Sequence, residues 1–183
     1  MITPKQYDDL MFKILEVRRI KDKFRFSSMA FFDLLKQDYY TLDILKPDVI
    51  FAGSAVLKSF DLLPSDYEPN DIDVLSVGMN PNILKHDRHR ARRISRGRGY
   101  GRNISRYGYG RNNDTITVET GQLKIDVLKP VLNDYSIQDV MGNSIKIALP
   151  SDIIKIKMEY GRPKDWELID MIVNRVNSAY NGI

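Results

Sequence analysis

Residues 49–77 constrain the fold of this chain more than any other stretch. They open with the short, β-branched apolar run Val49–Ala52, which predicts a buried strand. Gly53 and Ser54 follow, and a helical pattern then covers residues 55–60. A strand that turns into a helix through Gly and Ser presents bare N–H groups and a hydroxyl at a helix N-terminus. The turn is therefore a candidate phosphate-binding site.

Acidic residues lie on two further predicted strands. Because strand side chains alternate between faces, Asp71 and Asp73 of the strand at residues 70–75 point the same way. Asp126 lies among apolar residues of the strand at residues 122–128, where a lone carboxylate would be costly to bury. Neighbouring carboxylates repel each other unless a cation lies between them, and hard divalent ions bind oxygen ligands of this kind. The pattern therefore predicts a divalent metal site.

The remaining pattern predicts helices around these strands. Helical spacing predicts a helix over residues 4–20 with Thr3 as its N-cap, and a second helix that begins at Ser27 or Ser28. We expect a hairpin of residues 115–120 with the Asp126 strand, which places Asp126 beside the Asp71 strand. Residues 143–149 are expected to form an edge strand. Residues 61–70 read as a loop, which makes Asp66 and Glu68 a weaker acidic pair than Asp71 and Asp73.

The composition fits a single soluble domain over residues 1–183, with 43% hydrophobic and 28% charged residues. The chain has no cysteine, which excludes disulfides and thiolate metal sites. We see no signal-peptide pattern at the N-terminus, and no window approaches the ~18 apolar residues that a membrane helix needs. We therefore expect a cytoplasmic protein without a membrane partner.

Residues 85–113 form an Arg/Gly/Tyr-rich insertion that splits the net charge of +4 into +9 here and −5 elsewhere. Arginines contact phosphates, tyrosines stack on bases, and glycines let the backbone conform to a ligand. The alternative is a solvated loop that binds nothing. We expect nucleic acid binding, and RNA, DNA and the triphosphate alone all remain open as its ligand. The residues assigned to this surface are Arg92, Arg93, Arg96, Arg98, Tyr100, Arg102, Arg106, Tyr107, Tyr109 and Arg111.

The Gly-Ser turn, the D-x-D strand and the lone strand Asp, in this order, resemble the nucleotidyltransferase superfamily with the polymerase-beta-like fold. Residues 150–165 are also similar to the segment after the catalytic sheet in small bacterial nucleotidyltransferases and abortive-infection toxins. In that segment a Pro-acid pair starts a helix, a lysine lies near its end, and Gly-Arg-x-Lys-Asp opens the next helix. The likeness aligns Lys157 with the family lysine and residues 162–165 with R-x-K-D, and it covers about residues 48–170.

The C-terminal third also has a reading from its residues alone. Ser151 is expected to cap the first of the two helices, and Lys157 offers a point charge suited to phosphates. Asp165 and Asp170 are expected to cap and pair locally rather than to catalyse. Packing is the expected role of Trp166, although its ring could also stack on a base.

The resemblance implies an α/β (α+β) domain in which a small mixed sheet carries flanking N- and C-terminal helices. It implies that Asp71, Asp73 and Asp126 are catalytic and hold two Mg²⁺ ions, which Mn²⁺ can replace. Gly53 and Ser54 would then hold the phosphates of an NTP substrate. The cations that the resemblance adds to this phosphate site are Lys58, Lys157 and Arg162.

Three acceptors or roles stay open from the sequence. In the first, the chain transfers a nucleoside monophosphate to RNA, for example to a tRNA 3′ end. In the second, it modifies a protein hydroxyl, as AMPylation-type enzymes do, and the basic insertion docks an acidic protein partner. In the third, it is a non-catalytic nucleic-acid-binding protein. Toxin–antitoxin, phage-related and RNA-maintenance roles are all compatible with these readings.

Overall fold

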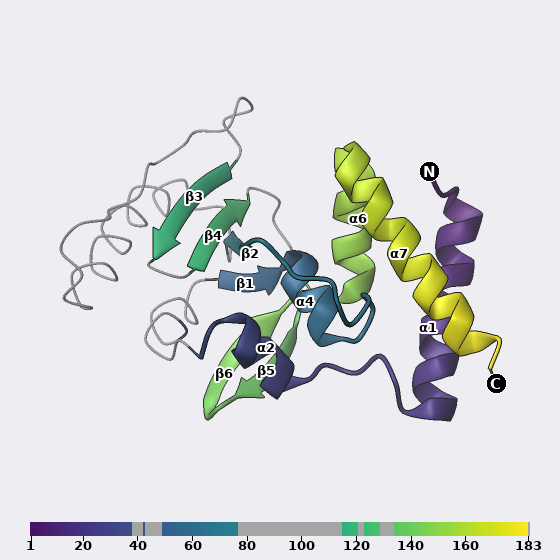
Figure 1. Ribbon diagram of the computed structural model, residues 1–183, viewed down its shortest axis with the longest axis horizontal. Coiled ribbons are helices and arrows are strands. Elements are labelled where there is room, and N and C mark those ends of the chain that lie inside the picture. The colour runs from purple at the N-terminus through teal and green to yellow at the C-terminus, as the bar shows by residue number, and fades with distance from the viewer. Residues whose placement is uncertain (38–41, 43–48, 77–114, 121–122, 129–133, 183) are drawn as a thin grey trace.

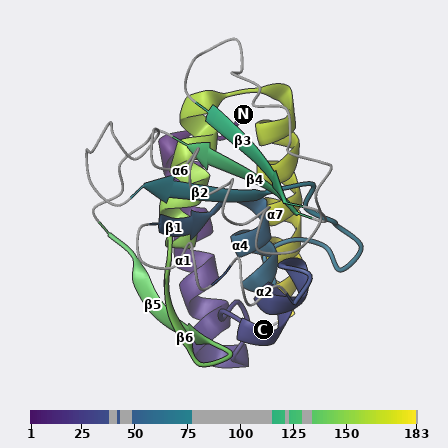
Figure 2. The same cartoon turned by 90° about the vertical axis from the view of Figure 1, so that its left-hand side faces the viewer.

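The computed structural model of the chain describes residues 1–37, 42, 49–76, 115–120, 123–128 and 134–182. Only the backbone is described at Ser76 and in residues 115–120 and 123–128. The described residues form one mixed sheet with helices on one side of it (Figures 1 and 2). The predicted mixed α/β class with flanking helices is therefore confirmed. The basic insertion at residues 85–113 and its assigned nucleic-acid-binding residues lie outside the described residues.

The sheet of the described residues has six strands in the order β3-β4-β2-β1-β6-β5. β1 pairs antiparallel with β2 and parallel with β6, while β2 pairs parallel with β4. The predicted β3–β4 hairpin and the predicted β1 strand are confirmed. The strands are β1 Val49–Ala52, β2 Ile72–Ser76, β3 Thr115–Thr120, β4 Leu123–Leu128, β5 Ser136–Val140 and β6 Asn143–Ile147.

The prediction of an edge strand after residue 142 was wrong. β6 lies inside the sheet because β5 pairs antiparallel with it across the turn at Met141 and Gly142. β5 was not predicted because its sequence, SIQDV, contains only two apolar residues, and one of them, Ile137, is 66% exposed. A strand that buries so little apolar surface leaves a weak signal in the sequence.

The described helices are α1 Pro4–Lys21, α2 Ser28–Leu34, α4 Gly53–Ser59, α6 Pro150–Tyr160 and α7 Pro163–Tyr180. The predicted caps of the first two are confirmed: Thr3 forms a capping box with Gln6, and the Ser27 side chain accepts from Ala30 N–H. The prediction that Ser151 caps α6 was wrong. Leu149 is the N-cap, and Pro150 occupies the first helical position.

The core lies between the sheet and the helices. Phe31 of α2 packs edge-to-face on Phe51 of β1, with ring centroids 5.2 Å apart, and neither side chain is exposed. Burying each ring contributes about 1.5–3 kcal/mol. This packing fixes the position of β1, the strand that leads directly into α4. Among the helices, α7 packs on both α1 and α6 (Figure 1). None of the helices in the described part of the chain is long and apolar enough to cross a membrane.

Candidate active site

A cavity of about 240 Å³ opens where β1 ends and β2 begins. Gly53 and Ser54 line it from the first turn of α4, Asp73 lines it from β2, and Asp71 lines it from the position just before β2, outside the strand that was predicted to contain it. Antiparallel pairing sets Asp73 opposite Ala52, the last residue of β1, so both predicted pairs lie at the same end of the sheet. The structure therefore brings together four residues that the sequence assigned to one site.

Gly53 approaches the Asp73 side chain more closely than any other residue type could. Its φ of +72° lies in the left-handed region that favours glycine. A Cβ built on Gly53 would overlap Asp73 Oδ2 and lie 2.6 Å from Asp73 Cβ. The Asp73 carboxylate thus lies directly against the backbone where α4 begins, and Ser54 beside it is 7% exposed.

The third predicted acid, Asp126, lies in β4 beside this pair. β4 runs parallel to β2, and the register pairs Asp126 with Asp73. Register partners on neighbouring strands of a pleated sheet belong to the same face. Among the residues whose side chains are described, no group of three His, Asp or Glu could hold a metal ion, and Asp126 is outside that set.

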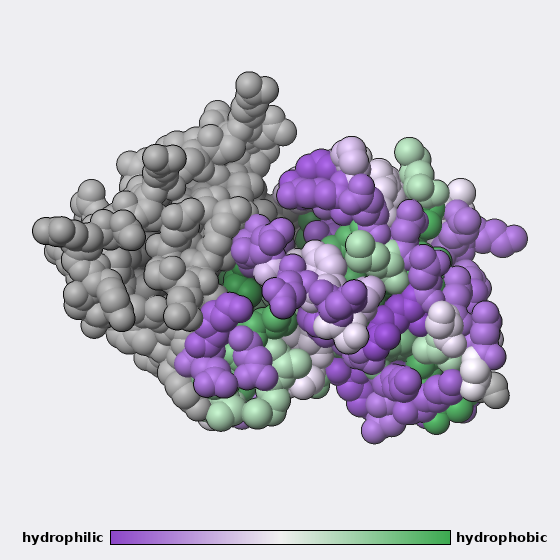
Figure 3. All heavy atoms as spheres, in the orientation of Figure 1, coloured by the Kyte–Doolittle hydropathy of each residue, from purple (hydrophilic) through white to green (hydrophobic). Residues whose placement is uncertain are grey.

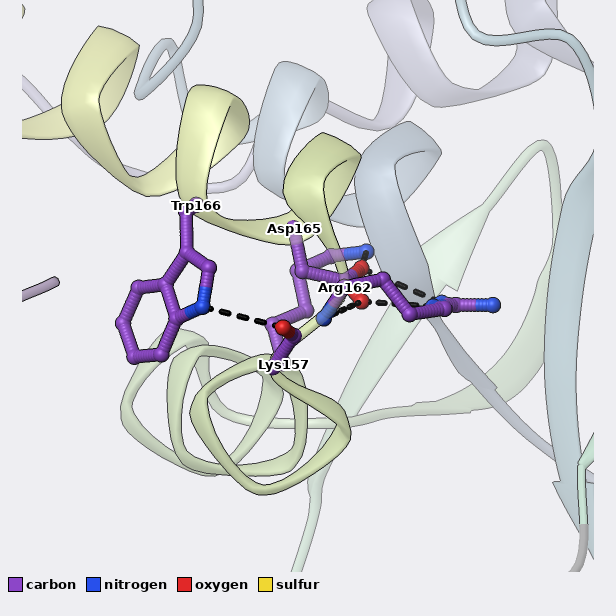
Figure 4. Close-up of polar contacts among 5 residues, drawn as sticks. Lys157, Arg162, Asp165 and Trp166 are labelled. Carbon is purple, nitrogen blue, oxygen red and sulfur yellow. Dashed lines mark hydrogen bonds and ion pairs between the residues drawn. The ribbon is translucent and has the colours of Figure 1, made fainter.

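An ion-pair cluster around the buried Asp165 carboxylate, with Lys157 and Arg162 as its cations, forms the basic wall of the cavity (Figure 4). The Asp165 side chain, on the first turn of α7, is only 1% exposed. Its Oδ2 accepts from Arg162 Nε at 2.6 Å and its Oδ1 accepts from Arg162 Nη2 at 3.1 Å. Lys157 Nζ of α6 lies 3.6 Å from Asp165 Oδ1. The predicted local pairing of Asp165 is confirmed, and the carboxylate also reaches a cation on another helix.

Burial and charge act in opposite directions on Asp165. Desolvation favours the neutral acid, but the hydrogen bond from Arg162 and the charges of Lys157 and Arg162 outweigh it, so the pKa of Asp165 lies below its usual value. The hydrogen bond to Asp165 raises the pKa of Arg162, and the nearby negative charge of Asp73 adds to this effect. Arg162 therefore lies within electrostatic range of both walls of the cavity.

Lys58 is the predicted phosphate ligand that the structure does not bring into this set. Its Nζ donates to the carbonyl oxygens of Pro64 and Ser65, the latter at 2.7 Å, and so ties down the loop before β2. It lines a neighbouring cavity of about 220 Å³, which also contains Glu68. Asp66, the other member of the weaker acidic pair, is exposed on the same loop.

Sequence reasoning missed several residues that line the cavity. Tyr67 and Asn70 reach it from the loop before β2, and Tyr160 reaches it from the end of α6. The Arg162 guanidinium lies 5.0 Å from the Tyr160 ring centroid, in cation–π contact. Asn70 directly precedes Asp71, which is the one signal that could have marked it. Trp166, in contrast, packs on the core as expected, and its indole N–H donates to the Gly161 carbonyl.

Comparisons of this chain with protein-family models, with curated proteins and with solved structures found no match. The chemistry of the cavity therefore carries the functional argument. Asp71 and Asp73 offer hard carboxylate oxygens, the ligands that Mg²⁺ prefers, and the Asp73 side chain lies directly against the Gly53 turn. Lys157 and Arg162 offer positive charge to a polyphosphate in the same cavity. The residues present fit a nucleotide bound together with divalent cations.

Proposed function

We propose that this protein is a metal-dependent nucleotidyltransferase that moves a nucleoside monophosphate from an NTP to a hydroxyl of RNA. One observation carries the proposal. Three separate segments of the chain line a single cavity with a Gly-Ser turn, a carboxylate pair and, from the distant C-terminal third, a cation pair. Each of the three groups alone is common, whereas their meeting at one cavity is what transfer from a triphosphate requires.

The basic wall is the part of the cavity that would bind the triphosphate. Lys157 and Arg162 would contact its β- and γ-phosphates, and the Gly53 N–H and Ser54 hydroxyl would add hydrogen bonds. Asp165 holds both cations in place before the substrate arrives, so little side-chain entropy is lost on binding.

The acidic wall of the cavity, which Asp71 and Asp73 form, is the part that would support the chemical step. The acceptor hydroxyl oxygen forms a bond to the α-phosphorus, the bond to the bridging oxygen breaks, and pyrophosphate leaves. We assign Asp126, in register with Asp73, to accept the proton of the hydroxyl. Asp71, Asp73 and Asp126 are the residues that would hold two Mg²⁺ ions. When bound, such ions neutralise charge on the triphosphate and make the acceptor hydroxyl more acidic.

RNA is the acceptor that the rest of the chain supports. The insertion at residues 85–113 combines ten Lys or Arg residues with three tyrosines, a composition suited to a single-stranded nucleic acid. A protein hydroxyl is the second acceptor, and it is favoured only by the same excess of positive charge. The two acceptors are distinguished directly by which polymer becomes labelled.

The test is incorporation of α-³²P-labelled NTPs, one at a time, in a cell extract that contains both RNA and protein. We expect label in RNA, dependent on Mg²⁺ and lost in Asp73→Asn. Asp66→Asn is the matched control, because this acid is exposed on the loop before β2 and is absent from the cavity lining. Label in protein would establish the second acceptor. Label in neither polymer would leave only a non-catalytic nucleic-acid-binding role.

A further inference from the structure

A second cavity, of about 490 Å³, adjoins the candidate active site along α7. Met171, 36% exposed, lines both cavities and so joins them. The second cavity lies between the end of α1, the C-terminal half of α7 and the turn after α4. Among the described residues, Met171 is the one lining residue that the two cavities share.

The charges of this second cavity differ from those of its neighbours. Its ionisable lining residues are Lys21, Lys23, Arg175 and Asp61, which give a net charge of +2. A third cavity, which shares Tyr67, Asn70 and Asp71 with the active site, is neutral, because Lys36 and Lys58 balance Glu68 and Asp71. The chain outside residues 85–113 carries −5 in total, so the second cavity is a basic site on an acidic body. We call it the α7 basic cavity.

Two of its cations are fixed in position by the protein. Lys21 Nζ donates to the Ala179 carbonyl at 2.9 Å, and Arg175 Nε donates to the Asp61 carbonyl at 2.8 Å, with an ion pair to the Asp61 carboxylate. An ammonium has three N–H donors and a guanidinium five, so both groups keep donors for an anion. The helix dipole favours a cation at the C-terminus of α1, which explains the position of Lys21. It does not explain the position of Arg175, which precedes the last turn of α7.

We propose that the α7 basic cavity binds the phosphate backbone of a single-stranded RNA whose 3′-terminal hydroxyl lies in the candidate active site. The proposal rests on the proposed function and names the path of its acceptor. A polynucleotide carries its phosphates directly behind the terminal hydroxyl, so one strand can satisfy the carboxylate-lined cavity and the cation-lined cavity together. A single strand suits a concave path of this kind because its backbone follows a charged groove. Met171, at the junction, offers an apolar surface to a base or ribose.

The test is the salt dependence of RNA binding, measured by fluorescence anisotropy with a 12-nucleotide single-stranded RNA and without NTP or Mg²⁺. Lys23→Glu reverses one exposed charge in the α7 basic cavity, and Lys36→Glu makes the same change in the neutral third cavity. We expect the slope of log affinity against log salt to fall by about 0.7 or more in Lys23→Glu, because each phosphate contact contributes that much for a single strand. Lys36→Glu should keep the wild-type slope. Both variants retain the insertion at residues 85–113, so its contribution cancels.

Equal slopes in the two variants, a larger loss in Lys36→Glu, or no RNA binding would overturn the assignment. Stronger binding of an acidic peptide than of RNA would also overturn it, in favour of a protein acceptor. The assay needs no turnover, so it separates the two proposals. A protein that binds RNA as expected but fails to label it would contradict the proposed function and leave the RNA path standing. Label in RNA together with an unchanged salt dependence of RNA binding in Lys23→Glu would support the proposed function and contradict the RNA path.

Discussion

The two walls of the candidate active site are positioned in different ways. On the acidic wall, strand register sets Asp73 opposite Ala52 and beside Asp126, so the backbone positions the carboxylates. On the basic wall, Lys157 and Arg162 come from a helix end and a helix start, and one buried side chain holds both. The acidic wall should therefore tolerate isosteric changes without loss of structure. The basic wall should lose order when Asp165 alone is changed.

The sharpest test of the acidic wall is Asp73→Asn. We expect the rate of nucleotide transfer to fall by about 10³-fold, or ~4 kcal/mol of transition-state stabilisation, because a metal-binding carboxylate is lost. The free energy of unfolding should change by less than about 1 kcal/mol, since the side chain keeps its shape. Transfer kinetics and urea unfolding measure the two quantities. A loss of unfolding free energy as large as the loss of transition-state stabilisation would contradict this expectation. It would show that the structure of the acidic wall depends on one side chain, as that of the basic wall does.

Asp165→Asn tests the basic wall. Breaking a buried ion pair typically costs about 3–5 kcal/mol, and we expect the lower end because Arg162, with a half-exposed side chain, can regain water. The KM for NTP should rise as the two cations lose their common partner. Asp170→Asn is the control, because Asp170 is exposed on the same helix and should change stability by less than about 0.5 kcal/mol. If the two variants had the same unfolding curve, Asp165 would not be the residue that stabilises the basic wall.

Gly53→Ala measures the contact between the turn and the acidic wall. A left-handed conformation costs a non-glycine residue about 1–3 kcal/mol, and here the new methyl also overlaps Asp73. Gly142→Ala is the matched control, because Gly142 has a φ of +82° but open space around its Cβ position. We expect Gly53→Ala to be the more destabilising variant in thermal unfolding. Equal costs would mean that backbone strain accounts for the whole effect and that Asp73 moves aside freely.

The smallest effect is on the pH dependence of stability. The pKa of Asp165 is lowered in the folded protein, so its contribution is present above the unfolded value of about 3.9 and is lost as the pH falls further towards the folded value. The stability difference between wild type and Asp165→Asn should therefore be constant from pH 7 to about 5 and shrink below about pH 4. Chemical denaturation at each pH measures it. A difference that grows on acidification would contradict the stated direction of the shift.

Local features of the fold were predictable because their signals are short in sequence. Thr3 lies three residues before Gln6, and this spacing alone specifies the capping box that the structure contains. The run Val49–Ala52 is local in the same sense, and so is the apolar run that forms β2 directly after Asp71. Such features can be predicted because they depend only on residues that are close in the sequence, and not on tertiary contacts.

Other features depend on packing and could not be predicted. The partners of Lys58 are carbonyl oxygens of a loop whose conformation no sequence pattern specifies. Likewise, the near-complete burial of Asp165 arises from the packing of α6 and α7, whereas its sequence context indicated only a helix cap. Leu149 is the cap in place of Ser151 because the helix begins at Pro150, two residues earlier than a Ser151 cap would place it.

The most direct measurement is a crystal structure of the protein with Mn²⁺ and a non-hydrolysable NTP analogue, with the metal located by anomalous scattering. We expect anomalous peaks within coordination distance, about 2.0–2.3 Å, of Asp71 and Asp73 carboxylate oxygens. We also expect the β- and γ-phosphates within hydrogen-bond distance of Lys157 and Arg162. A nucleotide bound elsewhere, or Mn²⁺ absent from Asp71 and Asp73 at saturating concentration, would contradict the proposed metal-dependent nucleotidyltransferase site.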